Sequence, residues 1–371
     1  MRENKILLIT QEFPPDVGGC GVVAKSMAKY LSEAGVDVEV LTSSSISGTT
    51  KTEEGYLIRN VKRIPKVFPL LFKWHLMWRN LEQFKYIIIN DVGAAFVASF
   101  FLSKKQQQKC IVYIQGGEAS IFDATKTNLK LYHALDFKTR YLTLLKNAHH
   151  IMAVSQCVKN YLLEVSKLDQ IKEKMSVIYP SLDLDIFYPE PINLHEKYSI
   201  EESSQLLLSA GRIDIKKGYE RQYLIFKKLI SKNPSYHWII VGVGPYSEEL
   251  KQKIKKDKLE KFITIDGRLT QSELRKYYSS VNLFWQLSIW ESLGLVYLEA
   301  NACGTPVIGT AGSGISEVID SNVSGYLVTR DEECLQILLE KSYTQIKESA
   351  LSEHVREFNL KREKILDVIK N

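Results

Sequence analysis

Short apolar runs alternate with longer stretches of helix-forming residues along nearly the whole chain. Ten runs of three or four residues carry the pattern, at positions 6–9, 38–41, 86–89, 111–114, 151–154, 206–209, 238–241, 262–265, 283–286 and 307–309. Strands covered on both faces by helices read as uninterrupted apolar runs, and the connecting helices supply the spacing. An amphipathic stretch from Gly19 to Leu31 is typical of such a connection. The sequence therefore predicts an α/β fold built on parallel sheets.

The chain is too long for one core and its strands fall into two series. A length of 371 residues favours two domains. Pro189 and Pro191 mark a linker between the series. We therefore expect domains at residues 1–187 and 188–354, both Rossmann-like and facing across a cleft, with ligands at the carboxyl ends of the strands.

Composition and cysteine usage indicate a cytoplasmic globular protein. Hydrophobic residues make up 45% and charged residues 25%, which disfavours disorder. The five cysteines are scattered and form no C-x-x-C pair, so we expect a reducing compartment and no structural zinc. No segment resembles a signal peptide, and the longest apolar run, residues 92–102, is too short to span a bilayer.

The net charge of +6 lies entirely in the first half of the chain. Residues 1–185 hold 24 basic and 18 acidic side chains, and residues 186–371 hold 25 of each. The excess is concentrated in residues 51–150, which hold 16 basic and 7 acidic side chains. No nucleic-acid motif accompanies this bias, so an anionic membrane or a phosphorylated acceptor is the expected partner. The tract 62–79 interleaves basic and large apolar residues, and it is either a core-packing helix with a basic outer face or a segment that contacts anionic lipid.

The tract 288–304 carries the clearest chemical signal. Glu291 and Glu299 lie eight positions apart, separated by a small Ser-Leu-Gly turn and an apolar run of helix formers. A turn that leads into a helix leaves backbone N–H groups pointing at one spot, which favours an anion such as a diphosphate. Two carboxylates beside this spot can accept hydrogen bonds from the hydroxyl groups of a sugar. Two glutamates alone are usually solvated surface residues, so the assignment needs the surrounding motifs.

Motifs on either side of this tract occur in a recognisable order. Ser-Ala-Gly-Arg at 209–212 precedes Ile-Asp-Ile-Lys-Lys-Gly, and Val-Gly-Val-Gly-Pro at 241–245 precedes Thr-Pro-Val-Ile-Gly at 305–309. Near the start, Phe-Pro-Pro-Asp-Val-Gly-Gly at 13–19 follows the first apolar run. From about residue 5 to about residue 330 the chain resembles the family 4 retaining glycosyltransferases (group 1 glycosyl transferases) of the GT-B fold. The resemblance implies that a helix at about 355–371 packs back on the first domain.

The resemblance assigns roles residue by residue. Arg212 and Lys217 lie just beyond a strand end, where two cations can converge on a leaving diphosphate, and they match the family's catalytic pair. Glu299 matches the ligand of the ribose hydroxyls and Glu291 the ligand of the transferred sugar. The remaining donor-binding positions are backbone or loop contacts at Gly18, Gly19, Gly211, Gly244, Arg268, Leu269, Ser292, Leu293, Gly294 and Leu295.

Gln115 departs from the family pattern. Many relatives carry a histidine there, which hydrogen-bonds the donor sugar close to the reaction. Glutamine donates and accepts hydrogen bonds but carries no proton at neutral pH. A retaining front-face mechanism lets the leaving phosphate take the acceptor proton, so activity is still expected.

The function implied is that of a retaining, metal-independent glycosyltransferase of the hexosyltransferase type. It would need no cofactor and would move a sugar from a nucleotide diphosphate sugar to a glycan or lipid-linked acceptor in surface polysaccharide or lipopolysaccharide assembly, on the inner face of the membrane. Asp183 and Asp185 form a D-x-D that we attribute to a turn rather than to a metal site. A nucleotide-sugar 2-epimerase and an impaired binding protein are the alternatives, and UDP, GDP and ADP remain open as the nucleotide.

Overall fold

The chain forms two compact units. A computed structural model describes residues 5–14, 18–44, 47–62, 64, 68–122, 135–346 and 348–370. Unit 1 comprises residues 1–181 and 361–371, and unit 2 comprises residues 182–360. The division therefore falls six residues before the expected boundary at 187/188, and the return to unit 1 falls at Lys361 rather than at about 355.

Unit 1 is built on a twisted, mostly parallel sheet. Among the described residues the sheet has eight strands, in the order β3-β4-β2-β1-β5-β6-β7-β8. All neighbours pair in parallel except β3 with β4. The strands are β1 Lys5–Ile9, β2 Asp37–Ser44, β3 Gly48–Lys51, β4 Leu57–Lys62, β5 Tyr86–Ile89, β6 Cys110–Ile114, β7 His150–Ala153 and β8 Met175–Val177.

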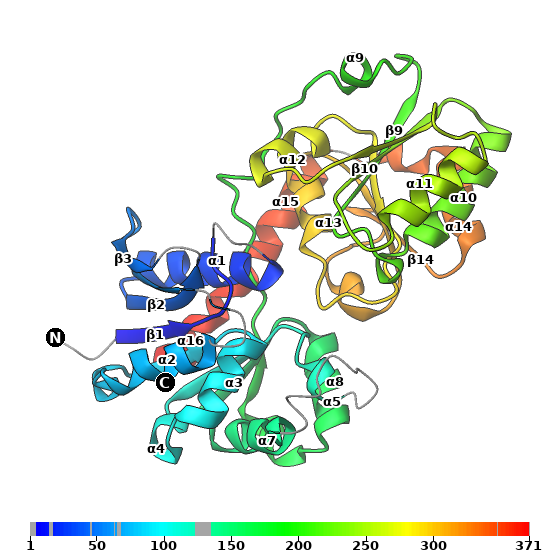
Figure 1. Ribbon diagram of the computed structural model, residues 1–371. Coiled ribbons are helices and arrows are strands. Elements are labelled where there is room, and N and C mark those ends of the chain that lie inside the picture. Colours follow the sequence, from blue (N-terminus) through cyan, green and yellow to red (C-terminus); the bar gives the residue numbers. More distant parts are fainter. Residues whose placement is uncertain are drawn as a thin grey trace. The chain divides into compact units, whose positions relative to one another are not determined.

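Helices lie on both sides of this sheet (Figure 1). Helix α1 buries Val23, Met27 and Leu31 at helical spacing, as its amphipathic sequence predicts. The α-helices of unit 1 are α1 Gly19–Glu33, α2 Phe68–Met77, α3 Val92–Phe101, α4 Lys104–Gln107, α5 Ala119–Phe122, α7 Phe137–Asn147, α8 Gln156–Ser166 and α16 Lys364–Lys370. Shorter 3₁₀ turns are η1 Leu81–Gln83, η3 Asp169–Lys174 and η7 Lys361–Glu363.

Unit 2 contains a second sheet, which is parallel throughout. Its six strands within the described residues follow the order β11-β10-β9-β12-β13-β14. Their bounds are β9 Gln205–Ala210, β10 Tyr236–Val241, β11 Ile263–Asp266, β12 Leu283–Gln286, β13 Val307–Thr310 and β14 Gly325–Val328. The order reverses at β9 and β12, and the carboxyl ends of strands at such a reversal are where ligands of this fold class bind.

The helices of unit 2 cover both faces of its sheet. Figure 1 shows α10, α11 and α14 on one side and α12, α13 and α15 on the other. The helices are α9 Leu194–Tyr198, α10 Tyr219–Lys232, α11 Ser247–Lys256, α12 Gln271–Tyr278, α13 Leu295–Ala302, α14 Asp331–Glu340 and α15 Glu348–Leu360. The 3₁₀ turns are η4 Ile215–Lys217, η5 Ser313–Glu317 and η6 Ser342–Gln345.

All ten predicted strands are present, and the four that were not predicted lie at or next to sheet edges. Strand β3 is exposed at every residue, and β4 is mostly half-buried. Strands β8 and β14 are short edge strands. Edge strands form through backbone pairing with one neighbour and need no buried apolar run, so their sequences do not show the pattern that identified the others.

A polar network inside the unit 2 core supports the loop that carries Lys217. The Ser209 hydroxyl accepts a hydrogen bond from the Trp238 indole at 2.9 Å and from the Gln222 amide at 2.8 Å. The Gln286 amide donates to Gln222 Oε1 at 3.2 Å and to the carbonyl of Lys217. Buried polar groups that are hydrogen-bonded in this way fix the geometry of the chain around them.

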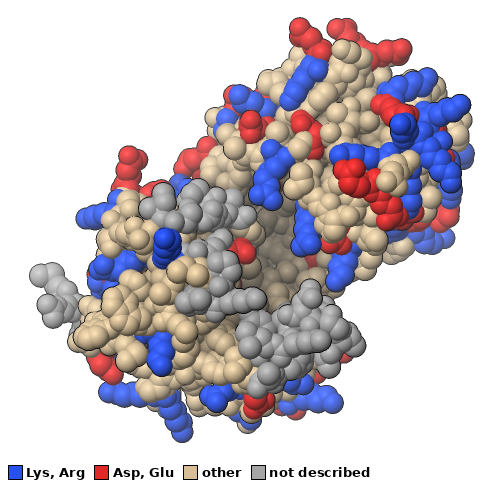
Figure 2. Space-filling view, viewed as in Figure 1, with Lys and Arg blue, Asp and Glu red and all other residues tan. Residues whose placement is uncertain are grey.

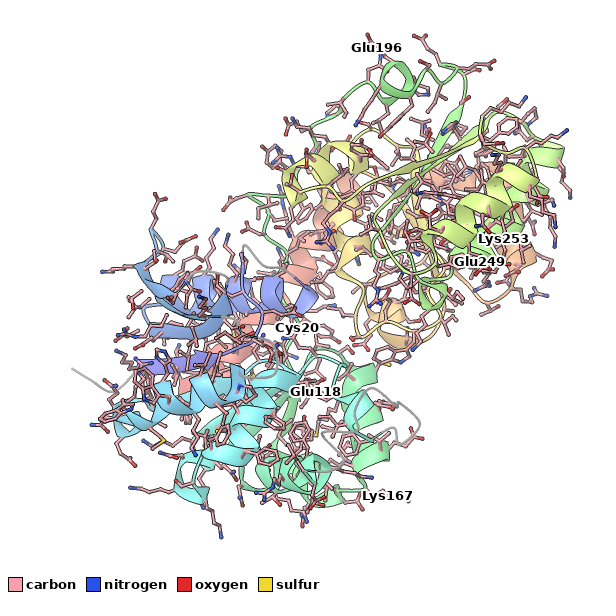
Figure 3. The ribbon with its side chains drawn as sticks, in the orientation of Figure 1. Cys20, Glu118, Lys167, Glu196, Glu249 and Lys253 are labelled. Atoms are coloured by element: carbon pink, nitrogen blue, oxygen red, sulfur yellow. The ribbon has the colours of Figure 1, made fainter. Side chains whose placement is uncertain are left out.

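Surface charges of opposite sign are intermixed on unit 2. Figure 2 shows Lys and Arg beside Asp and Glu over the region of α10 and α11. Lys253, for example, pairs with Glu220 at 2.7 Å and with Glu249 at 3.0 Å, and Figure 3 labels the latter pair. These pairs agree with the equal numbers of acidic and basic residues in the second half of the chain.

Candidate active site

Lys217 and Glu291 meet at the carboxyl ends of the unit 2 strands. Lys217 ends η4 and Glu291 follows β12, and the Lys217 Nζ lies 2.6 Å from Glu291 Oε1. The hydroxyl of Ser288 donates to the same carboxylate oxygen at 2.7 Å. A backbone hydrogen bond from Ile289 N to Lys216 O, at 2.9 Å, holds the two loops together. Two residues predicted to act on the donor are thus brought into direct contact.

The turn between the two glutamates forms the N-terminus of α13, as predicted. Gly294 is the N-cap residue, with φ +96°, a left-handed conformation that glycine adopts without strain. Leu293 is buried, so its side chain is not available to a ligand. The first N–H groups of α13 have no partner within the helix and carry its positive dipole end. This geometry suits a phosphate held by backbone amides.

Glu299 lies inside α13 and is half-buried. Its carboxylate accepts a hydrogen bond from the Tyr278 hydroxyl at 3.0 Å. Burial raises the pKa of Glu299 to about 7, and the Tyr278 hydrogen bond opposes that rise. Tyr278 belongs to α12, and nothing in the sequence indicated that it would face Glu299.

The raised pKa of Glu299 predicts a pH-dependent donor affinity. The ionised form of Glu299 accepts hydrogen bonds from hydroxyl groups. The affinity for the donor should therefore rise by up to about tenfold between pH 6 and pH 8. The dissociation constant of the intact nucleotide sugar, whose diphosphate does not titrate in this range, measures the effect. Glu299→Gln should bind more weakly and show no pH dependence. An unchanged pH profile in that variant would assign the titration to another group.

Arg212 follows Gly211 directly beyond β9 and is exposed. Its side chain is 70% exposed, and its Nε lies 3.8 Å from Asp214 Oδ2, a distance typical of a weak surface ion pair. The guanidinium therefore extends from the same strand end that leads to Lys217 and remains accessible to a ligand. Its convergence with Lys217 on a diphosphate stays a prediction.

A cavity opens at the ends of β10 and β11. Its volume is about 350 Å³, and it is lined by Gly242, Val243, Gly244, Ser247, Glu248, Lys251, Ile265, Asp266 and Gly267. Gly244 belongs to this lining, and Arg268 and Leu269 follow it directly in the chain. The Asp266 carboxylate accepts hydrogen bonds from Tyr198 at 2.5 Å and Tyr277 at 2.6 Å on Oδ2, and from the backbone N–H of Gly267 at 2.8 Å on Oδ1.

Gln115 lies in unit 1, directly after β6, and is buried. Its side-chain amide donates to the carbonyl of Asn90 at 2.8 Å and to Asn90 Oδ1 at 2.7 Å. Both amide hydrogens are therefore used, which leaves the side-chain oxygen as the group that can contact a sugar hydroxyl. Asn90 follows β5 and was not predicted as a site residue; a polar residue at the end of an apolar run was its one signal.

Glu118 fixes the loop that contains Gln115. Its carboxylate accepts the backbone N–H groups of Gln115 at 3.1 Å and of Gly116 at 2.8 Å. Glu118 is 2% exposed, and burial raises its pKa to about 7. Cys20, the second residue of α1, has a raised pKa. The main cause is burial of the thiol, and the second is the nearby charge of Glu118; Figure 3 labels both side chains.

A carboxylate lies where a phosphate was expected in unit 1. Gly18 and Gly19 begin α1 as predicted, but a Cβ on Gly18 would lie 2.2 Å from Glu12 Oε2. Glu12 thus occupies the N-terminal side of the helix, and Pro15, Asp16 and Val17 of the same loop lie outside the described residues. A phosphate contact at Gly18 and Gly19 remains a prediction and requires Glu12 to move aside.

The tract 62–79 contains helix α2, which has a buried and an exposed side. Phe72 and Leu76 are 1% and 5% exposed, so these two side chains pack inward, as the core-packing alternative expects, and Phe72 is not available to lipid. Four large apolar residues of α2 and the residue after it face solvent: Leu70, Trp74, Met77 and Trp78, at 59%, 59%, 70% and 77% exposure. We call these four the α2 apolar patch. Arg63, Lys66 and the side chain of Phe68 lie outside the described residues.

Asp183 and Asp185 form a turn, as predicted. The backbone N–H of Asp185 donates to Asp183 Oδ1 at 3.1 Å, an interaction typical of an aspartate-initiated turn. Over the described ranges, no group of three or more His, Cys, Asp and Glu side chains is placed to hold a metal ion.

Two family models match consecutive parts of the chain. Residues 17–186 match the model described as Glycosyltransferase Family 4, and residues 192–350 match the model described as Glycosyl transferases group 1. An uncharacterised glycosyltransferase of Methanocaldococcus jannaschii is 24% identical over 341 residues, which span 87% of this chain and 85% of that protein.

Solved structures share the fold over the whole length. The sucrose-phosphate synthase of Thermosynechococcus elongatus superposes with a TM-score of 0.77 at 19% identity, covering 98% of each chain. HepE of Anabaena, solved with UDP and glucose, gives a TM-score of 0.74 at 18% identity, covering 99% of this chain and 100% of that one. The expected two-domain GT-B architecture is confirmed, and the chain is a glycosyltransferase that belongs to the group 1 (family 4) glycosyltransferases.

Proposed function

We propose that this enzyme moves a sugar from a nucleotide diphosphate sugar to a glycan or lipid-linked acceptor with retention of configuration and without a metal ion. The observation that carries the proposal is the contact between Lys217 and Glu291 beside the N-terminus of α13. A cation for the leaving diphosphate, a carboxylate for sugar hydroxyls and helix amides for a phosphate are thus gathered at one end of one sheet.

The proposed chemistry requires the ion pair between Lys217 and Glu291 to separate. A bound donor would offer the diphosphate to Lys217 and Arg212 and the sugar hydroxyls to Glu291, while Glu299 takes the ribose. Negative charge that develops on the leaving phosphate is then met by fixed cations and helix amides. That phosphate can take the acceptor proton, so a protein base is not needed.

A donor panel tests the proposal. The protein is mixed with UDP-, GDP- and ADP-sugars and simple glycosides, with and without a chelator, and the anomeric configuration of the product is read by NMR. Transfer or slow donor hydrolysis with retention, undiminished by the chelator, is expected. Epimer exchange would indicate a nucleotide-sugar 2-epimerase, and binding without turnover an impaired protein. Loss in chelator with rescue by Mn²⁺ would contradict metal independence.

The similar solved structure contains UDP and glucose, which supports UDP as the first nucleotide to test. The cavity at the ends of β10 and β11 is where we propose that the base lies, beside Arg268 and Leu269. Because the Asp266 Oδ2 already accepts two tyrosine hydroxyls and Oδ1 the Gly267 N–H, we propose that backbone groups of this loop contribute to contacting the base.

We further propose that the α2 apolar patch contacts an anionic membrane, where a lipid-linked acceptor for surface polysaccharide or lipopolysaccharide would be found. Residues 70, 74, 77 and 78 follow helical spacing and so share one side. The Trp74 and Trp78 rings lie 6.4 Å apart. Lys62 and Lys73, which are close to the α2 apolar patch in the sequence, are exposed. No helix in the described part of the chain is long and apolar enough to cross a bilayer, so contact would be peripheral.

Vesicle binding measures this contact in two parts. The wild-type protein should bind anionic but not neutral vesicles, since each basic residue near the surface contributes about 1 kcal/mol. Replacing Lys62, Arg63, Lys66 and Lys73 with glutamate should abolish that preference. Trp74→Ser with Trp78→Ser should remove the part that high salt does not screen. Donor affinity should not change in either variant. Equal binding to neutral vesicles, or dimerisation without vesicle binding, would contradict the proposal.

A further inference from the structure

The first two residues of η5, Ser313 and Gly314, hold the backbone of Glu291 on both sides. The Ser313 hydroxyl accepts a hydrogen bond from the Glu291 N–H at 3.2 Å. The N–H of the next residue, Gly314, donates to the Glu291 carbonyl at 3.0 Å. Two groups of one residue are therefore fixed by a loop more than twenty residues further along the chain.

Ser313 adopts a backbone conformation that serine rarely takes. Its φ is +54°, in the left-handed region that favours glycine. Residues held in such conformations persist where the surrounding structure determines them, and they cluster at functional sites. Here the determining contacts are those that Ser313 and Gly314 make to the Glu291 backbone.

Fixing the Glu291 backbone sets the direction of its Cα–Cβ bond, from which the side chain extends to its own partners. The carboxylate oxygen that meets Lys217 at 2.6 Å also accepts the Ser288 hydroxyl at 2.7 Å. When a donor draws Lys217 toward its diphosphate, the Ser313 contact would still hold the Glu291 backbone. That contact therefore does not depend on the ion pair that the donor is proposed to disrupt.

We propose that Ser313 is a positioning residue that orients the Glu291 carboxylate toward the hydroxyl groups of the transferred sugar. Ser313 acts through the Glu291 backbone and touches no substrate itself. The inference rests on the proposed function, in which Glu291 contacts the sugar of the donor. It adds a residue that no motif of the sequence indicated.

Substitutions separate the hydroxyl from the backbone conformation. Ser313→Ala removes the acceptor and keeps the disfavoured conformation, whereas Ser313→Gly removes the acceptor and relieves the conformation. Both should lower kcat by about tenfold, because misplacing a group at a reacting centre slows the reaction without loss of the fold. Ser316→Ala is the matched control, since it removes a hydroxyl from the same loop that has no contact with Glu291. The control should keep kcat within about twofold of wild type.

A double-mutant cycle with Glu291→Gln tests whether Ser313 acts through Glu291. If it does, Ser313→Ala should cause no further loss of kcat in the Glu291→Gln background, because coupled residues are not additive. Losses that multiply in the double variant would overturn the inference. Equal losses in Ser313→Ala and Ser316→Ala would also overturn it, because they would show a general effect on the loop.

Binding provides a readout that does not need turnover. UDP and UDP-glucose, or the corresponding GDP or ADP pair if the donor panel selects it, are titrated into each variant. Ser313→Ala should bind the nucleoside diphosphate normally and lose the extra affinity for the nucleotide sugar, as Glu291→Gln does. Normal affinity for both ligands in Ser313→Ala overturns the inference alone. Failure of the wild-type protein to bind either ligand overturns the proposed function.

Discussion

Lys217→Ala is expected to lower kcat by about 10²- to 10³-fold, with a smaller effect on donor affinity. Removing one preorganised group that stabilises developing charge typically costs this much. Lys217 is the cation in contact with Glu291, and the Gln286 side-chain amide donates a hydrogen bond to the backbone carbonyl of Lys217. The loss should appear mainly in kcat, since the charge on the leaving phosphate is largest in the transition state. Steady-state kinetics with the donor found by the panel measure the effect.

Lys216→Ala is the matched control for this variant. Lys216 precedes Lys217 in the same turn, and its side chain is exposed. It should retain nearly full activity because the contact it makes to Ile289 uses its backbone carbonyl. Arg212→Ala should also lose orders of magnitude, for the same electrostatic reason. Near-wild-type rates for Lys217→Ala and Arg212→Ala would disprove the assignment of the diphosphate site.

Gly242→Ala should destabilise unit 2 and disrupt the donor site together. Gly242 follows β10 with φ +142°, and an added Cβ would lie 1.9 Å from the carbonyl oxygen of Gly211, which precedes Arg212. A strained backbone and a contact that only backbone movement can relieve should together cost about 2–5 kcal/mol. For a unit of this size the melting temperature should fall by about 5–15 °C. Thermal unfolding monitored with and without donor measures both effects.

Gly267→Ala is the control for that substitution. Gly267 follows β11 in the same cavity lining, but an added Cβ would meet nothing within 4 Å. Its melting temperature should stay near that of wild type, although a methyl group in the cavity can change donor affinity. An equal loss of stability in the two variants would show that the Gly211 contact is not the cause.

The sequence predicted the parts of the site that are local in the chain. Glu291, the Ser-Leu-Gly turn and Glu299 lie within nine residues, so their closeness in the chain places them around the N-terminus of α13. The ten apolar runs were also local signals, because a strand covered on both faces must be apolar at every position. Strands β3, β8 and β14 were missed because they are edge strands, which need no such run, and β4 lies next to the edge strand β3.

Contacts between distant segments could not be predicted. Lys217 and Glu291 are 74 residues apart, and the sequence proposed a shared ligand for them but not their direct ion pair. The sequence did not show that Tyr278 would contact Glu299, or that Asn90 would contact Gln115. It also did not show that Glu12 would lie beside Gly18. Helix α2 illustrates the same limit, since its basic and aromatic composition did not reveal that Phe72 points inward and Trp74 outward.

The sequence by itself determined the fold class, the family and the positions of the turns that we propose to bind the donor, because periodicity and short motifs depend on neighbouring residues. The tertiary structure alone decided which side chains pair, which carboxylates are buried with a raised pKa, and that Ser313 holds Glu291. Those properties depend on how loops from different strands pack against one another. Packing sets burial and distance, and these in turn set the strength of every charged and hydrogen-bonded contact in the site.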